Sequence, residues 1–184
     1  SRGLGDVYKR QTLASAAHVE GFGSLAGIVK GKGEILDHLK PGGIAVLNQD
    51  DPHVQAWIDR VRGCRTVQFS VQQDAPAAYR AGEIESLADG RVSFSLVTPV
   101  GALDISMKLL GRHNVMNAVA SAAVALEAGA GLEHVKRGLE SAQPVQGRLC
   151  AVHGLGGALV LDDSYNASPN SFRAAIEVLA SFSG

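Results

Sequence analysis

The spacing of apolar positions divides the chain into helical and extended segments. From residue 25 to residue 39, apolar side chains recur at the three- and four-residue steps of one helix face, and Ser24 before them is a favourable N-cap. Residues 43–48 (GIAVLN) then form a short apolar run, which is typical of a strand buried on both faces. Asp51 as a cap and Pro52 at the first helical position predict a second helix, with Trp57 in its apolar stripe.

From residue 66 the apolar positions alternate with smaller or polar ones, and this period of two predicts antiparallel strands. The alternating apolar residues are Val67, Phe69, Val92, Phe94, Leu96, Leu103, Ile105, Met107 and Leu109. Asp89 and Gly90 lie between two such runs, so we expect a hairpin turn in which both residues take positive φ. Residues 99–101 (PVG) mark the next reversal of the chain.

Helical spacing returns in residues 114–128, and a shorter helix is predicted for residues 132–139. Residues 144–147 (PVQG) form a connector, after which an apolar strand (158–161) and an amphipathic helix (171–182) begin a second unit. We therefore predict an α/β fold: a partial central domain, residues 12–147, with a mixed sheet, helices and antiparallel hairpins, followed by the start of a Rossmann-like domain, residues 148–184. A doubly wound domain needs several more strands, so we expect the chain to be part of a longer protein.

Composition narrows the class of protein. Of the 184 residues, 46% are hydrophobic and 19% are charged, which is typical of a globular protein. Lys and Arg number 17 against 18 Asp and Glu, and this near-neutral balance argues against binding to nucleic acid or to anionic lipid. Cys64 and Cys150 form no zinc-binding or disulfide pattern, and no apolar run approaches the roughly 20 residues of a membrane span. These features predict a cytoplasmic protein without membrane insertion.

Lys32 is the first candidate for chemistry, because helical spacing places it on the apolar face between Ile28 and Leu36. One interpretation is that its stem packs on the sheet while the ammonium reaches water. In the other, burial favours the neutral amine, which reacts with carbon dioxide to give a carbamate, an anionic oxygen ligand for a metal. His18 in the preceding loop is either a second ligand or a structural side chain, and Glu20 competes with it as a ligand.

Two further pairs of polar residues indicate a nucleotide site. Asn114 and Asn117 are three residues apart at the start of a predicted helix; Asn114 is also a preferred N-cap, whereas the Asn117 amide suits the edge of a purine. Arg148 follows the connector and Asp163 follows the strand at 158–161, where ligands of open α/β sheets bind. Taken alone, Arg148 could be an ordinary surface arginine, and Asp163 could be a polar residue where a strand ends in a loop. Taken together, they favour recognition of a phosphate and a ribose.

The segments that carry these residues resemble, in the same order, those of the ATP-dependent Mur ligases of peptidoglycan synthesis. The resemblance rests on AHVEGFGSLAG (residues 17–27), KGKGE (30–34), LNQDD (47–51), GRHNVMN (111–117), GRL (147–149) and LDDSYNASP (161–169). It covers residues 12–184. The first and last of these segments resemble the ligase that adds D-alanyl-D-alanine rather than those that add L-Ala, D-Glu or the third residue.

This resemblance implies a reaction that uses ATP and Mg²⁺. The terminal carboxylate of UDP-MurNAc-tripeptide would attack the γ-phosphate of ATP, and the amine of D-Ala-D-Ala would displace phosphate from the acyl phosphate. Such chemistry depends mainly on positioning and on cations near the developing charge. The implied roles are Mg²⁺ binding by His18 and carbamylated Lys32, contact with the adenine region by Asn114 and Asn117, contact with the phosphate or ribose end by Arg148 and Asp163, and proximity to the reacting groups for Asn166.

The sequence also departs from the family pattern. It contains no Gly-x-x-Gly-Lys-Thr/Ser phosphate loop, which the family carries upstream of the position of His18 together with a metal-binding glutamate. Residues 1–11 match nothing expected there, so we predict that they are a non-native lead-in derived from a vector or adaptor. We expect the chain alone to be an inactive monomer. Two alternatives stay open: a related ligase of the folylpolyglutamate or cyanophycin synthetase type, and a non-catalytic fragment that binds nucleotide weakly or serves as an interaction module.

Overall fold

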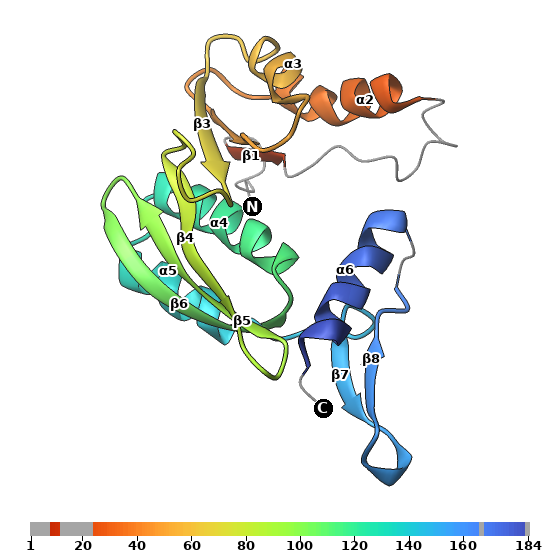
Figure 1. The fold of residues 1–184 in the computed structure, drawn as a ribbon. Helices are drawn as coiled ribbons and strands as arrows, with labels where there is room; N and C mark the ends of the chain where they lie inside the picture. Colours follow the sequence, from red (N-terminus) through yellow and green to blue (C-terminus); the bar gives the residue numbers. More distant parts are fainter. Residues whose placement is uncertain (1–7, 12–23, 166–167, 183–184) are drawn as a thin grey trace, which may run out of the picture.

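The computed structural model describes residues 8–11, 24–165 and 168–182, and these form two sheets with helices packed against them (Figure 1). The strands of the larger sheet lie in chain order: β1 (Tyr8–Gln11), β2 (Ile44–Asn48), β3 (Arg65–Ser70), β4 (Tyr79–Ser86), β5 (Arg91–Thr98) and β6 (Gly101–Leu110). The smaller sheet pairs β7 (Cys150–His153) with β8 (Leu159–Asp162). The helices are α2 (Leu25–Asp37), α3 (Val54–Ile58), α4 (His113–Glu127), α5 (Leu132–Ser141) and α6 (Pro169–Ser181), with a 3₁₀ turn at Leu155–Gly157. The mixed α/β fold predicted from the sequence is confirmed.

Strand direction changes in the middle of the larger sheet. β1, β2, β3 and β4 pair in parallel, whereas β4, β5 and β6 pair antiparallel. The prediction that β3 is antiparallel was wrong. Its alternating pattern reflects one buried and one half-exposed face, and the crossover through α3 sets its direction. The hairpin between β4 and β5 is confirmed, but only Gly90 has a positive φ (77°), and Asp89 does not.

Strand β2 is buried along its whole length because the two sides of the sheet are covered by different helices. Ala45 and Leu47 pack with Leu36 of α2 and Trp57 of α3. Val46, between them in sequence, faces the opposite side and joins the core beneath α4. The continuous apolar run at residues 43–48 therefore predicted the environment of this strand correctly.

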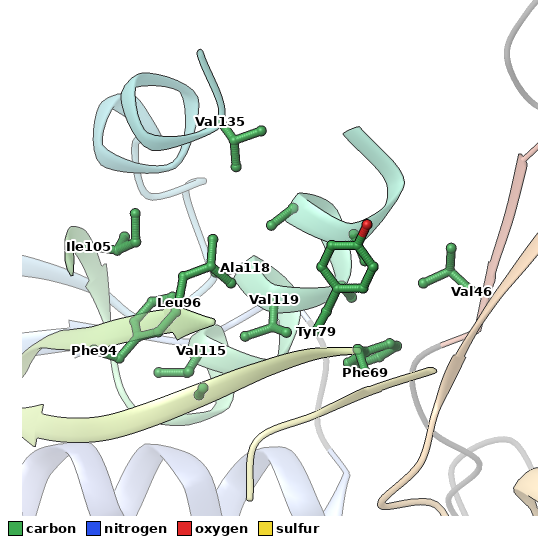
Figure 2. Packing of buried hydrophobic residues seen from close by; sticks show 14 of the residues in the cluster. Val46, Phe69, Tyr79, Phe94, Leu96, Ile105, Val115, Ala118, Val119 and Val135 are labelled. Atoms are coloured by element: carbon green, nitrogen blue, oxygen red, sulfur yellow. The ribbon is translucent and has the colours of Figure 1, made fainter. Parts of the chain in front are cut away.

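Helix α4 supplies the centre of the main core. Val115, Ala118 and Val119 of α4 point toward Phe94 and Leu96 of β5, and Val135 of α5 lies above them (Figure 2). Four buried alanines on α4 allow the helix to approach the sheet closely: Ala118, Ala120, Ala122 and Ala123. This packing fixes the N-terminal end of α4 beside the end of β6.

Of two helix starts predicted from the sequence, one is confirmed and one is wrong. Ser24 caps α2 as predicted, since its Oγ accepts the N–H of Gly27 at 3.0 Å. The prediction that Pro52 begins the next helix was wrong, because α3 starts at Val54. Asp51 Oδ1 does accept the N–H of His53 at 2.8 Å. This carboxylate therefore stabilises the turn that precedes α3 and is not the N-cap of the helix.

The second unit begins with β7, a strand that the sequence analysis missed, and ends with α6. A capping box starts α6: Ser168 Oγ accepts the N–H of Ser171 at 3.1 Å, and Ser171 Oγ accepts the N–H of Ser168 at 2.9 Å. A small cluster of Leu110, Leu149 and Val178 joins this unit to the end of β6. Within the described part of the chain, every helix is too short or too polar to cross a bilayer.

Candidate functional site

A cleft of about 380 Å³ lies between α4 and α6. It is bounded by the end of β6, the first turns of α4, the connector after α5, the residue after β8 and the start of α6. Its lining residues are Leu109, His113, Asn114, Asn117, Gln143, Val145, Arg148, Leu149, Asp163, Ser171 and Ala174. Four residues predicted to contact a cofactor, Asn114, Asn117, Arg148 and Asp163, are thus brought to one cleft from three separate segments.

The two asparagines form a chain of hydrogen bonds along the first turns of α4. Asn114 Nδ2 donates to the carbonyl of Leu110 at 2.8 Å, and Asn117 Nδ2 donates to Asn114 Oδ1 at 3.3 Å. The interpretation of Asn114 as an N-cap was wrong, because the cap position is Arg112 and Asn114 lies inside the helix. Both amides are half-buried, so their orientation is held while part of each group faces the cleft.

His113 adds an imidazole to the same wall, and the sequence analysis gave it no role. Burial lowers the pKa of His113, while the charges of Asp163 and Glu177 act in the opposite direction. Its Nε2 lies 3.2 Å from Asn114 Nδ2, a contact that fits a neutral ring accepting the amide N–H. The sequence feature that could have identified His113 as a site residue is its position beside Asn114 at the start of a predicted helix.

The connector is tied to the loop after β8 by its backbone. The N–H of Gly147 donates to Asp162 Oδ2 at 3.2 Å, and its carbonyl accepts the N–H of Tyr165 at 2.9 Å. Gly147 has φ 75°, and a Cβ there would lie 3.2 Å from the Tyr165 nitrogen, so this approach favours glycine. The Arg148 guanidinium then stacks over the Tyr165 ring, 4.0 Å from its centroid.

The two adjacent aspartates have different tasks. Asp162 accepts the hydroxyl of Ser164 at 2.6 Å and two backbone N–H groups, and these hydrogen bonds from Ser164 and Gly147 lower its pKa. Asp163 instead lines the cleft, as Arg148 does. The cleft therefore presents one guanidinium, one carboxylate, one imidazole and the side-chain amides of Asn114, Asn117 and Gln143, a set that fits a phosphate, a sugar hydroxyl and a heterocycle edge.

The predicted metal pair is described only in part. Lys32 is half-buried on α2, although Leu25 on its expected apolar face is 41% exposed. Next to Lys32, a Cβ on Gly33 would lie 3.0 Å from Arg60 Nη1 and 3.1 Å from the Trp57 ring, so α2 and α3 are in close contact. His18 and Asn166 lie outside the described residues, and the described ranges contain no group of three or more His, Cys, Asp or Glu arranged to hold a metal.

The LNQDD segment, which also carried the resemblance, ties the ends of β2 and β3 together. Asp50 accepts the hydroxyl of Ser70 at 2.5 Å and the N–H of Val71 at 2.8 Å. Asn48 is fully buried; its Oδ1 accepts the N–H of Asp50, and its Nδ2 lies 3.5 Å from the sulfur of Met116 on α4. These bonds give the segment a structural role at the carboxyl edge of the parallel strands.

Comparison with known proteins identifies the family. The Mur ligase middle domain matches residues 11–125. The UDP-N-acetylmuramoyl-tripeptide–D-alanyl-D-alanine ligase of Escherichia coli (strain K12) is 42% identical over 170 residues, which are 92% of this chain and 37% of that protein. The ligase of the same name from Mycobacterium tuberculosis (strain ATCC 25618 / H37Rv) is 36% identical over 165 residues, 89% of this chain and 32% of that protein.

Solved structures agree with these relatives. A crystal structure of MurF from Acinetobacter baumannii has a TM-score of 0.89 and 34% identity, and the match covers 96% of this chain and 38% of that one. The MurF ligase from Thermotoga maritima in complex with ADP has a TM-score of 0.79 and 26% identity, covering 97% of this chain and 39% of that one. The chain spans 37% of the length of the Escherichia coli relative. Its matched middle domain shows that the chain belongs to the Mur ligase family.

Proposed function

We propose that the protein to which this chain belongs ligates D-Ala-D-Ala to UDP-MurNAc-tripeptide. The proposal is supported by the relatives that share 40–42% identity and are named for this reaction. The observation that carries it is the cleft, which gathers Asn114, Asn117, Arg148 and Asp163 between α4 and α6. We further propose residues 12–147 as part of the central ATP-binding domain and residues 148–184 as the beginning of the C-terminal domain.

The residues of the cleft fit ATP. The hydrogen-bonded amides of Asn114 and Asn117 offer donors and acceptors to a purine edge. The Arg148 fork suits a phosphate oxygen pair, and the Asp163 carboxylate suits a ribose hydroxyl. A MurF ligase of similar fold has been solved with ADP. The first turns of α4 also present the positive end of a helix dipole to this cleft.

The remaining roles concern the reacting phosphate. We assign Mg²⁺ binding to His18 and to Lys32 as its carbamate, and we place Asn166 near the reacting groups. The metal would supply positive charge for the γ-phosphate while the tripeptide carboxylate attacks it and ADP leaves. The amine of D-Ala-D-Ala then forms the peptide bond and expels phosphate. Asn114, Asn117, Arg148 and Asp163 act only by holding ATP in line.

We also propose a cytoplasmic, monomeric enzyme; its two cysteines, Cys64 and Cys150, are unpaired, which fits a reducing compartment. The chain alone is proposed to be catalytically inactive, since its sequence lacks a phosphate loop. Tyr8–Gln11 pairs with β2, and residues 1–11 stay a predicted lead-in. Sequencing the source DNA upstream of the codon for residue 12 tests this. If a reading frame that encodes a phosphate loop continues directly into residue 12, residues 1–11 are foreign.

The test is phosphate release by the intact ligase. We expect release only when ATP, Mg²⁺, UDP-MurNAc-tripeptide and D-Ala-D-Ala are all present, and none when L-Ala or D-Glu replaces the dipeptide. Release with a folate or an arginine–aspartate polymer as acceptor, and none with D-Ala-D-Ala, would instead favour the folylpolyglutamate or cyanophycin synthetase type. Titration of the 184-residue chain with Mg-ATP distinguishes a weakly binding fragment from one without a nucleotide site.

A further inference from the structure

The strongest feature outside the cleft is the contact between α6 and two glycines of the larger sheet. Gly90 closes the β4–β5 hairpin, Gly111 follows β6, and the N–H of Gly111 donates to the carbonyl of Gly90 at 3.0 Å. Both have positive φ, 77° and 83°. We call this pair the glycine seat. Figure 1 shows α6 beside the loop that joins β4 and β5.

Val178 of α6 and Phe182, the residue that ends this helix, occupy the space that a Cβ would need at the two glycines. At Gly111 a Cβ would lie 2.5 Å from Val178 Cγ2 and 2.9 Å from the His113 ring, and at Gly90 it would lie 2.8 Å from the Phe182 ring. Val178 is only 3% exposed and packs with Leu110 and Leu149. The glycines are therefore needed for two separate reasons, the backbone conformation and the close approach of α6.

The same stripe of α6 continues into the cleft. Ser171 and Ala174 line the cleft, and Val178 follows four residues after Ala174 on the same face of α6. Gly111 is likewise joined through one short turn to His113 and Asn114 on the opposite wall. The glycine seat therefore lies between the α6 wall and the α4 wall of the cleft.

Leu149 shows that this junction is held under backbone strain. It is the one residue other than glycine with a positive φ (50°) among those described, and it directly follows Arg148. Such a conformation persists only where surrounding packing over-determines it. Leu149 is 5% exposed against Leu110 and Val178, so the cluster beside the glycine seat also fixes the connector that carries Arg148.

We infer that Gly111 and Val178 are positioning residues of the proposed ligase: the glycine seat docks α6 and thereby sets the width of the nucleotide cleft. This inference rests on the proposed function for its consequence, but the docking itself is measurable without nucleotide. The variant is Gly111→Ala. Its matched control is Gly42→Ala, because Gly42 has nearly the same φ, 79°, and no atom within 4 Å of its Cβ position.

The first measurement is hydrogen–deuterium exchange of the 184-residue chain. We expect amides of α6 to exchange at least tenfold faster in Gly111→Ala than in Gly42→Ala. We also expect Val178→Ala to cost α6 less protection in the Gly111→Ala chain than in the wild-type chain, because its clash with the new Cβ is then gone. Equal α6 exchange in the two glycine variants would overturn the inference. So would additive effects, in which Val178→Ala costs α6 as much protection in the Gly111→Ala chain as in the wild-type chain.

The second measurement is steady-state kinetics of the intact ligase. We expect Gly111→Ala to raise KM for ATP several-fold more than it lowers kcat, and Gly42→Ala to leave both near wild type. Faster α6 exchange with an unchanged KM for ATP would overturn the positioning role. An intact protein without any ATP-dependent ligation would overturn the proposed function instead, and the exchange result would still decide whether the glycines dock α6.

Discussion

Lys32 is the residue whose proposed chemistry departs most from its ordinary behaviour. In the intact ligase we expect Lys32→Ala to lower kcat by about two orders of magnitude or more, the scale of removing a group that stabilises developing charge. Lys30→Ala is the matched control, because Lys30 lies on the same helix with an exposed side chain and contributes its backbone carbonyl, not its amine, to the bond with Arg60. Phosphate-release assays measure both.

Chemical rescue separates a carbamate ligand from a structural lysine. If a small acid can take the place of the carbamate, bicarbonate or a short carboxylic acid should restore part of the activity of Lys32→Ala and leave that of wild type unchanged. An active Lys32→Ala enzyme that is indifferent to bicarbonate would contradict the metal-ligand assignment.

His113 provides a pH-dependent prediction. Burial lowers its pKa below 6.5, so the unfolded chain binds a proton more readily than the folded one between these two pKa values. Stability must therefore fall as the pH drops through 6.5 toward the folded-state pKa. We expect the free energy of unfolding of wild type to fall more steeply between pH 7.5 and 5.5 than that of His113→Gln, measured by urea denaturation at each pH. Parallel curves would contradict the prediction.

At the scale of elements, Tyr79 and Glu127 connect the end of α4 to the sheet. The Tyr79 hydroxyl donates to Glu127 Oε1 at 2.8 Å, and Glu127 is also paired with Arg65 at the start of β3. Tyr79 is 4% exposed, and burial followed by this bond raises its pKa above the ordinary value. The phenol therefore stays protonated and donates throughout the neutral range.

Tyr79→Phe should lower the free energy of unfolding by about 1–2 kcal/mol, the loss of one buried hydrogen bond to a charged acceptor. Tyr165→Phe is the control, because its ring is 67% exposed, and it should change stability by less than about 0.5 kcal/mol. Urea unfolding followed by the fluorescence of Trp57, the single tryptophan, measures both. Equal effects of the two variants would show that the bond from Tyr79 contributes nothing.

The elements that were predicted correctly are those whose signals are local. Ser24 before α2 and the apolar run of β2 depend on nearby residues or on burial on both faces, and both were identified. The direction of β3 was missed because alternation reports burial and not the neighbour's direction. The strand β7 was missed because its side chains are mostly exposed, so no apolar period marks it.

At the scale of the whole molecule, the structure brings together four residues to which the family resemblance gave roles in ATP binding. Asn114, Asn117, Arg148 and Asp163 line one cleft, and their contact with ATP stays a prediction. Their bonds depend on packing between segments far apart in sequence, which no local pattern contains. The bond from Gly147 to Asp162 and the contact between Gly111 and Val178 are two examples.

Asp162 offers a test of that junction. Its carboxylate accepts from the Gly147 N–H with one oxygen and from Ser164 with the other, and these bonds hold its pKa below 3.8. An amide at this position would turn one acceptor into a donor that faces another N–H or O–H. Asp162→Asn should therefore free the connector and shift Arg148, which lies next to Gly147.

In the intact ligase we expect Asp162→Asn to raise KM for ATP about three- to tenfold, the effect of weakening a charge-assisted hydrogen bond near the surface. Asp59→Asn is the control, because Asp59, the residue that follows α3, accepts a hydrogen bond from the Gln55 side chain and lies outside the cleft lining. The lowered pKa of Asp162 stabilises the folded state at a pH above the pKa of the unfolded chain, and this effect is lost as the pH falls through the pKa of the folded chain. The free energy of unfolding of wild type and of Asp162→Asn should therefore differ at pH 7 and converge only in strong acid. An Asp162→Asn ligase with the wild-type KM for ATP at pH 7 would show that the hydrogen bond from Gly147 to Asp162 is not needed to position Arg148.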